Sequence, residues 1–265
     1  MERLAGAKRI VVKVGTSTLT YETGLVNIRR IEQLVKVLSD LANSGREIIF
    51  VTSGAISVGA GKLRLAQKPK DTPGRQAAAA VGQSELMHLY DNLFTSYNHN
   101  VAQVLLTKDV VDDELRRKNV VNTFNRLLGY RAIPIVNEND TVAVDELEGD
   151  HFGDNDTLSA VVATLVDADV LVILSDFDGL FDDNPRKNKD AKLIPTVARV
   201  DSYIESVAKG SGSSRGTGGM ATKIQAAKIL EAAGIDMAII RGSSPELLYD
   251  LTEGKHVGTF FDFRN

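Results

Sequence analysis

Lys13 is the first residue whose type and position point to chemistry. It stands inside the apolar run Val11–Val14 and is followed at once by Gly15-Thr16-Ser17-Thr18, which offers hydroxyls and close backbone approach to an anion. Charged side chains are rarely buried without a partner, so a lysine in such a run is either an edge residue facing water or a functional cation at a strand end. The turn that follows favours the functional cation.

A second cation, Lys223, comes directly after the most glycine-rich part of the chain. The run from Gly210 to Gly219 holds five glycines and three serines, and Met220-Ala221-Thr222-Lys223 then opens a helix. A surface loop is the ordinary interpretation of this composition. Because a helix N-terminus presents free N–H groups and the positive end of a dipole, the helix and its lysine favour phosphate binding.

Two known nucleotide fingerprints fit this chain poorly. A P-loop fails because Leu63 follows Gly61-Lys62 where Ser or Thr is required, and Ile56 stands where the first glycine should be. The segment Gly216–Ala221 matches G-x-G-x-x-A, with Asp236 twenty residues on, but no strand precedes it. A dinucleotide-dependent dehydrogenase is therefore the less favoured alternative.

Acidic residues gather in one stretch of the chain. Asn137 to Asp156 carries eight acids and no Lys or Arg, although the net charge of the whole chain is only −4. Such a stretch is either a solvated loop or a site for a cation or amine. The four histidines lack ligand spacing, no EF-hand pattern occurs and cysteine is absent, so we expect no protein metal cage.

The remaining chemistry favours phosphoryl transfer. Ser53-Gly54 lacks the G-x-S-x-G elbow of an esterase, whereas Lys13, Lys223 and an acid such as Asp156 suit an anionic transferring group better than acyl transfer or redox chemistry.

Alternating apolar strands and amphipathic helices must position these residues. Strands are expected at Arg9–Val14, Glu47–Val51, Val101–Leu106, Ile133–Val136, Val170–Leu174 and Met237–Ile240. Helices are expected from Ile28 to about Gly45, and near Pro73–Ser96, Leu115–Leu128, Asp156–Leu165, Met220–Ala233 and Pro245–Leu251.

This alternation predicts an α/β fold with an open, mainly parallel sheet sandwiched between helices. A closed eight-fold barrel is the alternative, but the strand spacing is uneven. We expect one domain of 265 residues with an N-terminal lobe of about 1–168 and a C-terminal lobe of about 169–265. The absence of cysteine, of a leader pattern and of an 18-residue apolar run predicts a cytoplasmic protein without a membrane span, and the net charge argues against nucleic-acid binding.

Six motifs resemble the amino acid kinase family, and together they are typical of its glutamate-phosphorylating branch. They are VVKVGTSTL (11–19), VTSGAISVG (51–59), AAVGQSEL (79–86), VNENDTVA (136–143), GDNDTLSA (153–160) and GTGGMATK (216–223). The resemblance covers essentially the whole chain. Many such relatives continue into a C-terminal PUA domain, and we expect a form without it.

The resemblance implies transfer of the γ-phosphoryl group of ATP to the side-chain carboxylate of L-glutamate, the first step of proline biosynthesis. A carboxylate with a reference pKa of about 4.3 is ionised at neutral pH, so this acceptor needs no general base. Mg²⁺ is expected to be held mainly by ATP oxygens and water. Sister kinases acting on acetylglutamate, aspartate or carbamate are alternatives, as is an amino-acid sensor without catalysis.

Site residues follow from the resemblance one motif at a time. Lys13 and Lys223 are expected to meet the phosphates from the acceptor and nucleotide sides, with Asp156 orienting both, unless Asp156 only caps a helix or stands in its first turn. The expected nucleotide-binding set is Lys13, Ser175, Asp176, Thr217, Gly218, Gly219, Met220, Ala221, Thr222 and Lys223. The expected substrate-binding set is Ser53 for a carboxylate, Asp140 for the ammonium, and Gly54 and Asn155.

The resemblance also implies partners. Proline is expected as a feedback inhibitor whose site overlaps Asp140 and includes Glu146. A homo-oligomer and functional coupling to the next enzyme of the pathway are further expectations.

Overall fold

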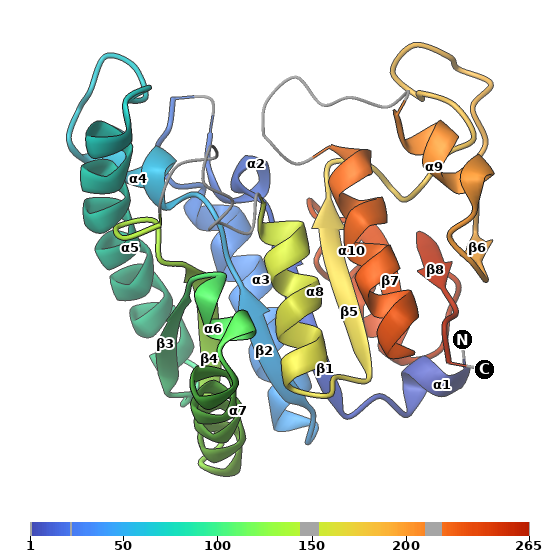
Figure 1. Cartoon of the computed structure of the whole chain (residues 1–265), viewed down its shortest axis with the longest axis horizontal. Helices are drawn as coiled ribbons and strands as arrows, with labels where there is room; N and C mark the ends of the chain where they lie inside the picture. Colours follow the sequence, from blue (N-terminus) through green and yellow to red (C-terminus); the bar gives the residue numbers. More distant parts are fainter. Residues whose placement is uncertain (1, 22, 144–153, 210–218, 265) are drawn as a thin grey trace.

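The computed structural model describes residues 2–21, 23–143, 154–209 and 219–264, and its centre is an eight-stranded sheet flanked by helices (Figure 1). The strands lie in the order β3-β4-β2-β1-β5-β7-β8-β6. Their bounds are β1 Arg9–Val14, β2 Glu47–Val51, β3 Val101–Leu106, β4 Ile133–Glu138, β5 Val170–Ser175, β6 Thr196–Val197, β7 Asp236–Arg241 and β8 Thr259–Phe261.

Six neighbouring strands run parallel, and β8 alone pairs antiparallel with its neighbour β7. The open, mainly parallel α/β sheet expected from the sequence is confirmed. In the register of the central strands, Lys13 lies opposite Val51 on β2 and Ile173 on β5. Because parallel strands end at one edge, the polar segments that follow β1, β2, β4 and β5 share that edge.

Each face of the sheet carries its own apolar core, because successive strand residues point to opposite faces. Val12 and Phe50 pack on the side of α3 and α5, whereas Val11 and Val51 pack on the side of α7, α8 and α10. Figure 1 shows α8 and α10 on one side of the sheet and α3 on the other. The helices are α1 Glu2–Ala5, α2 Thr16–Leu19, α3 Ile28–Asn43, α4 Ala55–Lys62, α5 Thr72–Thr95, α6 Asp109–Asp112, α7 Glu114–Gly129, α8 Asn155–Leu165, α9 Ser202–Lys209, α10 Met220–Ala233 and α11 Leu247–Thr252.

Local sequence signals explain where the longer helices begin and end. Asn27 caps α3 by accepting a hydrogen bond from the backbone N–H of Arg30, and Asp71 caps α5 in the same way. Helix α10 ends at Gly234, whose φ of 66° is in the left-handed region that glycine tolerates best.

Helices α4 and α5 cross at unusually close range. A Cβ atom added at Gly59 would lie 1.8 Å from the backbone oxygen of Ala78, and one added at Gly82 would lie 1.8 Å from that of Ala55. Only glycine fits at either position. The backbones of the two helices therefore touch directly, and this contact fixes α4 at the end of β2.

Several elements differ from the sequence-based expectations. The turn expected after β1 contains the short helix α2, helix α4 follows β2 where no helix was expected, and β4 continues through Glu138 beyond the expected end at Val136. The short strands β6 and β8 were not expected. Among the described residues, no helix has the length and apolar character needed to cross a membrane.

Candidate active site

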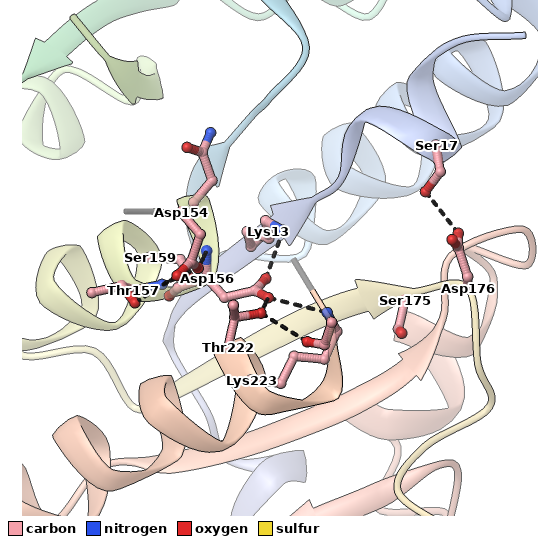
Figure 2. Close-up of polar contacts among 12 residues, drawn as sticks. Lys13, Ser17, Asp154, Asp156, Thr157, Ser159, Ser175, Asp176, Thr222 and Lys223 are labelled. Carbon is pink, nitrogen blue, oxygen red and sulfur yellow. Dashed lines mark hydrogen bonds and ion pairs between the residues drawn. The ribbon is translucent and has the colours of Figure 1, made fainter. Parts of the chain in front are cut away.

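Lys13, Asp156 and Lys223 form one buried cluster at the carboxyl edge of the sheet (Figure 2). The Nζ of Lys13 lies 2.6 Å from Oδ1 of Asp156, and the Nζ of Lys223 lies 3.1 Å from its Oδ2. Both lysines are only 7% exposed and Asp156 is fully buried. Three distant segments thus converge, since Lys13 lies on β1, Asp156 in the first turn of α8 and Lys223 in the first turn of α10.

The charges in this cluster do not cancel. Burial alone would raise the pKa of Asp156, but the two ammonium groups and the hydrogen bonds from Lys13 and Thr222 hold its pKa well below the usual range. Burial lowers the pKa of Lys223, and Asp156 opposes that effect. Among the described residues, Asp156 is the one carboxylate paired with the two ammonium groups, and Asp154 attracts Lys223 more weakly, so the cluster suits an anionic ligand.

The two helix starts beside the cluster are equipped differently. Asp154 caps α8, because its Oδ1 accepts hydrogen bonds from the backbone N–H groups of Asp156 at 2.7 Å and Thr157 at 2.9 Å. Gly219 is the N-cap of α10 and provides no side-chain cap. Among the described residues, no side chain caps the start of α10, so its backbone N–H groups suit a phosphate, which is a favourable acceptor at this end of a helix.

Thr222 holds Asp156 and α10 together. Its hydroxyl lies 2.7 Å from Oδ2 of Asp156 and 2.7 Å from the backbone oxygen of Gly219. The sequence placed Thr222 only among the nucleotide-binding residues, whereas its hydroxyl contacts the carboxylate. Met220 beside it is buried, and Ala221 is exposed. Thr217 and Gly218 lie outside the described residues.

Ser175 and Asp176 lie where β5 ends. Ser175 is buried and its Oγ accepts a hydrogen bond from the backbone N–H of Phe177. Asp176 is exposed and accepts a 2.7 Å hydrogen bond from Ser17, which belongs to α2. Figure 2 shows this Ser17–Asp176 contact apart from the lysine cluster.

Ser53 and Gly54 connect β2 to α4. Ser53 is buried, and Gly54 has a φ of 92°, a conformation that a residue with a Cβ rarely adopts. Gly54 is also the N-cap of α4 and gives no side-chain cap. This start of α4 can therefore offer backbone N–H groups to a carboxylate beside the Ser53 hydroxyl.

Asn155 is held by two acceptors. Its Nδ2 donates to the backbone oxygen of Thr52 at 2.5 Å and to Oδ1 of Asn137 at 2.8 Å. The Nδ2 of Asn137 in turn donates to Oε1 of Gln83 at 2.9 Å. Three amide side chains from α8, β4 and α5 thus form one hydrogen-bonded chain.

Asp140 carries an unusual carboxyl group just beyond β4. Burial and the neighbouring charge of Glu138 raise its pKa to about 6, although Arg75 acts in the opposite direction. A carboxylate in this environment gains from a cation, and an ammonium group would supply one. Glu146 lies outside the described residues.

Sequence reasoning left several of these participants unassigned. Gln83 and Asn137 fall inside quoted motifs but received no role, and Asp154 was passed over although an Asp two residues before a first-turn acid is a capping signal. Among the described residues, no three His, Asp or Glu side chains gather in a way that could hold a metal ion.

Comparison with known proteins identifies relatives of this chain. The model of the amino acid kinase family matches residues 8–241. A protein of Clostridium perfringens named glutamate 5-kinase is 55% identical over 259 residues, which cover 97% of this chain and 96% of that protein. A protein of Listeria innocua with the same name is 51% identical over 261 residues, covering 98% and 95%.

Solved structures with the same fold are far less similar in sequence. UMP kinase from Bacillus anthracis superposes with a TM-score of 0.65 at 16% identity and covers 98% of this chain and 97% of that one. An isopentenyl phosphate kinase gives a TM-score of 0.67 at 14% identity, with 96% and 99% covered. The sheet, its buried lysine cluster and the match over most of the sequence lead to one conclusion: the chain belongs to the amino acid kinase family.

Proposed function

We propose that this protein is a glutamate 5-kinase, which transfers the γ-phosphoryl group of ATP to the side-chain carboxylate of L-glutamate and so forms glutamyl 5-phosphate for proline biosynthesis. The observation that carries the proposal is the buried Lys13–Asp156–Lys223 cluster with its excess positive charge. The high identity to relatives named glutamate 5-kinase, over nearly the full length of both chains, supports the same activity.

The cluster suits a reaction between two anions. The acceptor carboxylate, with a reference pKa of about 4.3, needs no base, so the protein has only to offset repulsion and hold the groups in line. In this proposal, Lys13 offsets charge on the acceptor side and Lys223 on the nucleotide side. Asp156 holds both ammonium groups in place, and it is unsuited to accept a proton because its pKa is held low.

The residues present fit a nucleoside triphosphate. The uncapped start of α10 and the ammonium group of Lys223 offer a phosphate both N–H donors and a full charge. ATP supplies the phosphoryl group, and Mg²⁺ offsets part of its charge. We assign the metal to nucleotide oxygens and water, an arrangement that requires few protein ligands.

We assign binding of the α-carboxylate and α-ammonium groups of glutamate to the residues around α4 and β4. Ser53 and the start of α4 bind the α-carboxylate, while Asp140 and the oxygen of Asn155, to which no described residue donates, accept hydrogen bonds from the α-ammonium group. The lobe of about residues 1–168 then carries the amino acid and that of 169–265 the nucleotide. The sheet runs without a break across this division, because β5 pairs with both β1 and β7.

A product-trapping assay tests the activity directly. We expect ADP release that depends on L-glutamate, together with a hydroxamate when hydroxylamine traps the acyl phosphate. The same assay with acetylglutamate, aspartate or carbamate separates the sister kinases. Glutamate binding without ADP release under any condition would identify a sensor and contradict the proposal.

Proline inhibition is a separate prediction that rests on the family resemblance. Proline shares the α-ammonium and α-carboxylate groups of glutamate but lacks a second carboxylate, so it can fill the recognition half of the site without accepting phosphate. We expect proline to compete with glutamate. Glu146→Ala should weaken this inhibition more than it lowers the activity at saturating glutamate. No response of the wild type to millimolar proline at subsaturating glutamate would remove the overlapping site. A homo-oligomer and coupling to the next enzyme of the pathway stay predictions.

A further inference from the structure

The amide chain Gln83–Asn137–Asn155 has a fixed direction. Rotation of a side-chain amide exchanges the positions of its oxygen and nitrogen. Two backbone groups that contact this chain have fixed donor or acceptor roles. The N–H of Glu138 donates to Oδ1 of Asn137 at 2.9 Å, and the carbonyl oxygen of Thr52 accepts from Nδ2 of Asn155. Because a backbone N–H only donates and a carbonyl oxygen only accepts, each amide of the chain has one allowed orientation.

That orientation determines what Asn155 presents. Its nitrogen donates to Thr52 and Asn137, so its oxygen faces the other side of the amide, where no described residue donates to it. The N–H of Glu138 keeps the Asn137 oxygen toward Asn155, and Oε1 of Gln83 supports the same orientation by accepting from the Asn137 nitrogen. Gln83 thus stands at the far end of the chain from the substrate-binding amide.

Packing alone does not explain a glutamine at position 83. It is 7% exposed on α5, and its Nε2 is buried without a hydrogen-bond partner among the described residues. A buried donor without a partner is destabilising, and an apolar side chain of similar size would avoid that loss. Its other end, Oε1, accepts a hydrogen bond from Nδ2 of Asn137, and this bond holds Asn137 in the orientation that the N–H of Glu138 selects.

Helix α5 also supports Thr52, the other acceptor of the Asn155 nitrogen. The hydroxyl of Tyr90, seven residues beyond Gln83, lies 2.7 Å from Oγ1 of Thr52, and both residues are fully buried. One helix therefore positions Thr52 through Tyr90 and Asn137 through Gln83. Both acceptors of the Asn155 nitrogen are therefore supported by the same helix.

We propose that Gln83 is a positioning residue for substrate specificity: it holds Asn137 in place, which keeps the oxygen of Asn155 toward the α-ammonium group and so selects substrates with a free amine. This inference rests on the proposed function. It predicts that Gln83 affects recognition of the ammonium group alone, and neither nucleotide binding nor recognition of the carboxylates.

The first test replaces Gln83 and compares two ligands. Gln83→Met keeps the length but removes the acceptor, and we expect the KM for glutamate to rise about 10-fold while the KM for ATP stays unchanged. Inhibition by glutarate, which lacks the amine, should keep its wild-type Ki. Gln83→Glu retains an acceptor oxygen and should recover most of the affinity. Gln103→Met, the same change at an exposed position on β3, is the matched control.

A double-mutant cycle tests whether Gln83 acts through Asn155. We expect Gln83→Met to change the KM for glutamate by less than 2-fold or so in an Asn155→Ala background, because the amide it orients is gone. Equal losses for glutamate and glutarate, or full additivity in the cycle, would overturn the proposal. If Gln83→Met does not fold, Gln83→Ala takes its place in both comparisons.

The outcome stays separate from that of the proposed function. Calorimetric titration of the wild type and Gln83→Met with glutamate measures the same affinity ratio without catalysis. Wild-type binding without ADP release would reject the kinase activity and leave the role of Gln83 open to this titration. Activity with an unchanged affinity in Gln83→Met would reject only the role of Gln83.

Discussion

The two halves of the candidate site are built from different kinds of group. On the side proposed to bind phosphate, Lys13, Asp156 and Lys223 are charged, buried and paired. On the opposite side, the groups are neutral amides and a serine, with Asp140 as the acid beside them. Charges that face each other can hold a geometry and still leave an excess for a phosphate, whereas neutral amides fix orientation without competing for a zwitterionic substrate.

The two acids show the difference most clearly. Asp156 has a lowered pKa because two ammonium groups outweigh its burial, and Asp140 has a pKa raised to about 6 because burial and Glu138 outweigh Arg75. The first acid has its cations within the protein. The second is better satisfied when a cation arrives from outside, and substitutions can test this contrast.

The largest effect is expected for Asp156→Asn. Removing the carboxylate leaves two buried ammonium groups without a counter-charge, and breaking such a buried cluster costs about 3–5 kcal/mol of unfolding free energy. Urea unfolding at pH 7.5 measures it. Because the folded-state pKa is lowered, this stabilisation is present above the unfolded value of about 3.9 and is lost as pH falls through the folded pKa. A variant as stable as the wild type would show that the ion pairs contribute nothing.

Lys223→Ala should reduce kcat by about 10²–10³ and change the KM for glutamate little, because its charge matters most as negative charge develops on the transferring group. Steady-state kinetics with both substrates gives the result. Lys228→Ala is the matched control, since Lys228 is on the same helix but pairs with Glu205 at the surface. A near-normal kcat in Lys223→Ala would leave this lysine as a structural partner of Asp156.

Asp140→Asn should raise the KM for glutamate by about 10- to 100-fold, the usual range for a lost charged hydrogen bond, without changing the KM for ATP. The wild-type kcat/KM for glutamate should also fall as pH drops through about 6, where Asp140 takes up a proton. The variant should lack this inflection. Parallel increases in both KM values would instead indicate that the segment after β4 is only structural.

The same substitution should act on stability with a sign opposite to that of Asp156→Asn. A raised folded-state pKa means that ionised Asp140 destabilises the fold above about pH 6, and this effect disappears below the unfolded value near 3.9. Asp140→Asn should therefore have a higher Tm than the wild type at pH 7.5 and an equal one at pH 4. A lower Tm at pH 7.5 would break the contrast between the two acids.

Ser53→Ala should have the smallest effect, an increase of about 2- to 10-fold in the KM for glutamate, because a neutral hydrogen bond contributes less than a charged one. Thr18→Ala offers a control at another buried hydroxyl near the same edge of the sheet. A change in kcat alone would place Ser53 on the phosphate side of the comparison.

Regular elements could be predicted from the sequence because their signals are local. The apolar run of β1, the Asn27 cap of α3 and the helical spacing of α10 each suffice to identify an element. Helix α4 was missed because glycines at 59 and 61 lower helix propensity, and only the fold shows that Gly59 packs against α5 and Gly61 against Gly24. Strand β6 has two residues, too few for any periodic signal.

The site was predictable where charge marked it and unpredictable where neutral groups make it. Lys13 and Lys223 stand out in their surroundings, and the structure brings both to Asp156. Gln83 gives no such signal, because a glutamine on a helix is ordinarily exposed and only the fold shows it buried. The roles assigned to these residues stay predictions until the variants are measured.

The glycine contact between α4 and α5 leaves no room for a side chain between the two helices. Gly82 is next to Gln83, and Gly59 is in the helix whose first residues follow Ser53 and Gly54. Even a single methyl group at either glycine must separate the backbones and tilt one helix against the other. If the proposed roles of Ser53 and Gln83 hold, the spacing of this helix pair is a place, away from the ligand itself, where directed evolution can change the accepted amino acid.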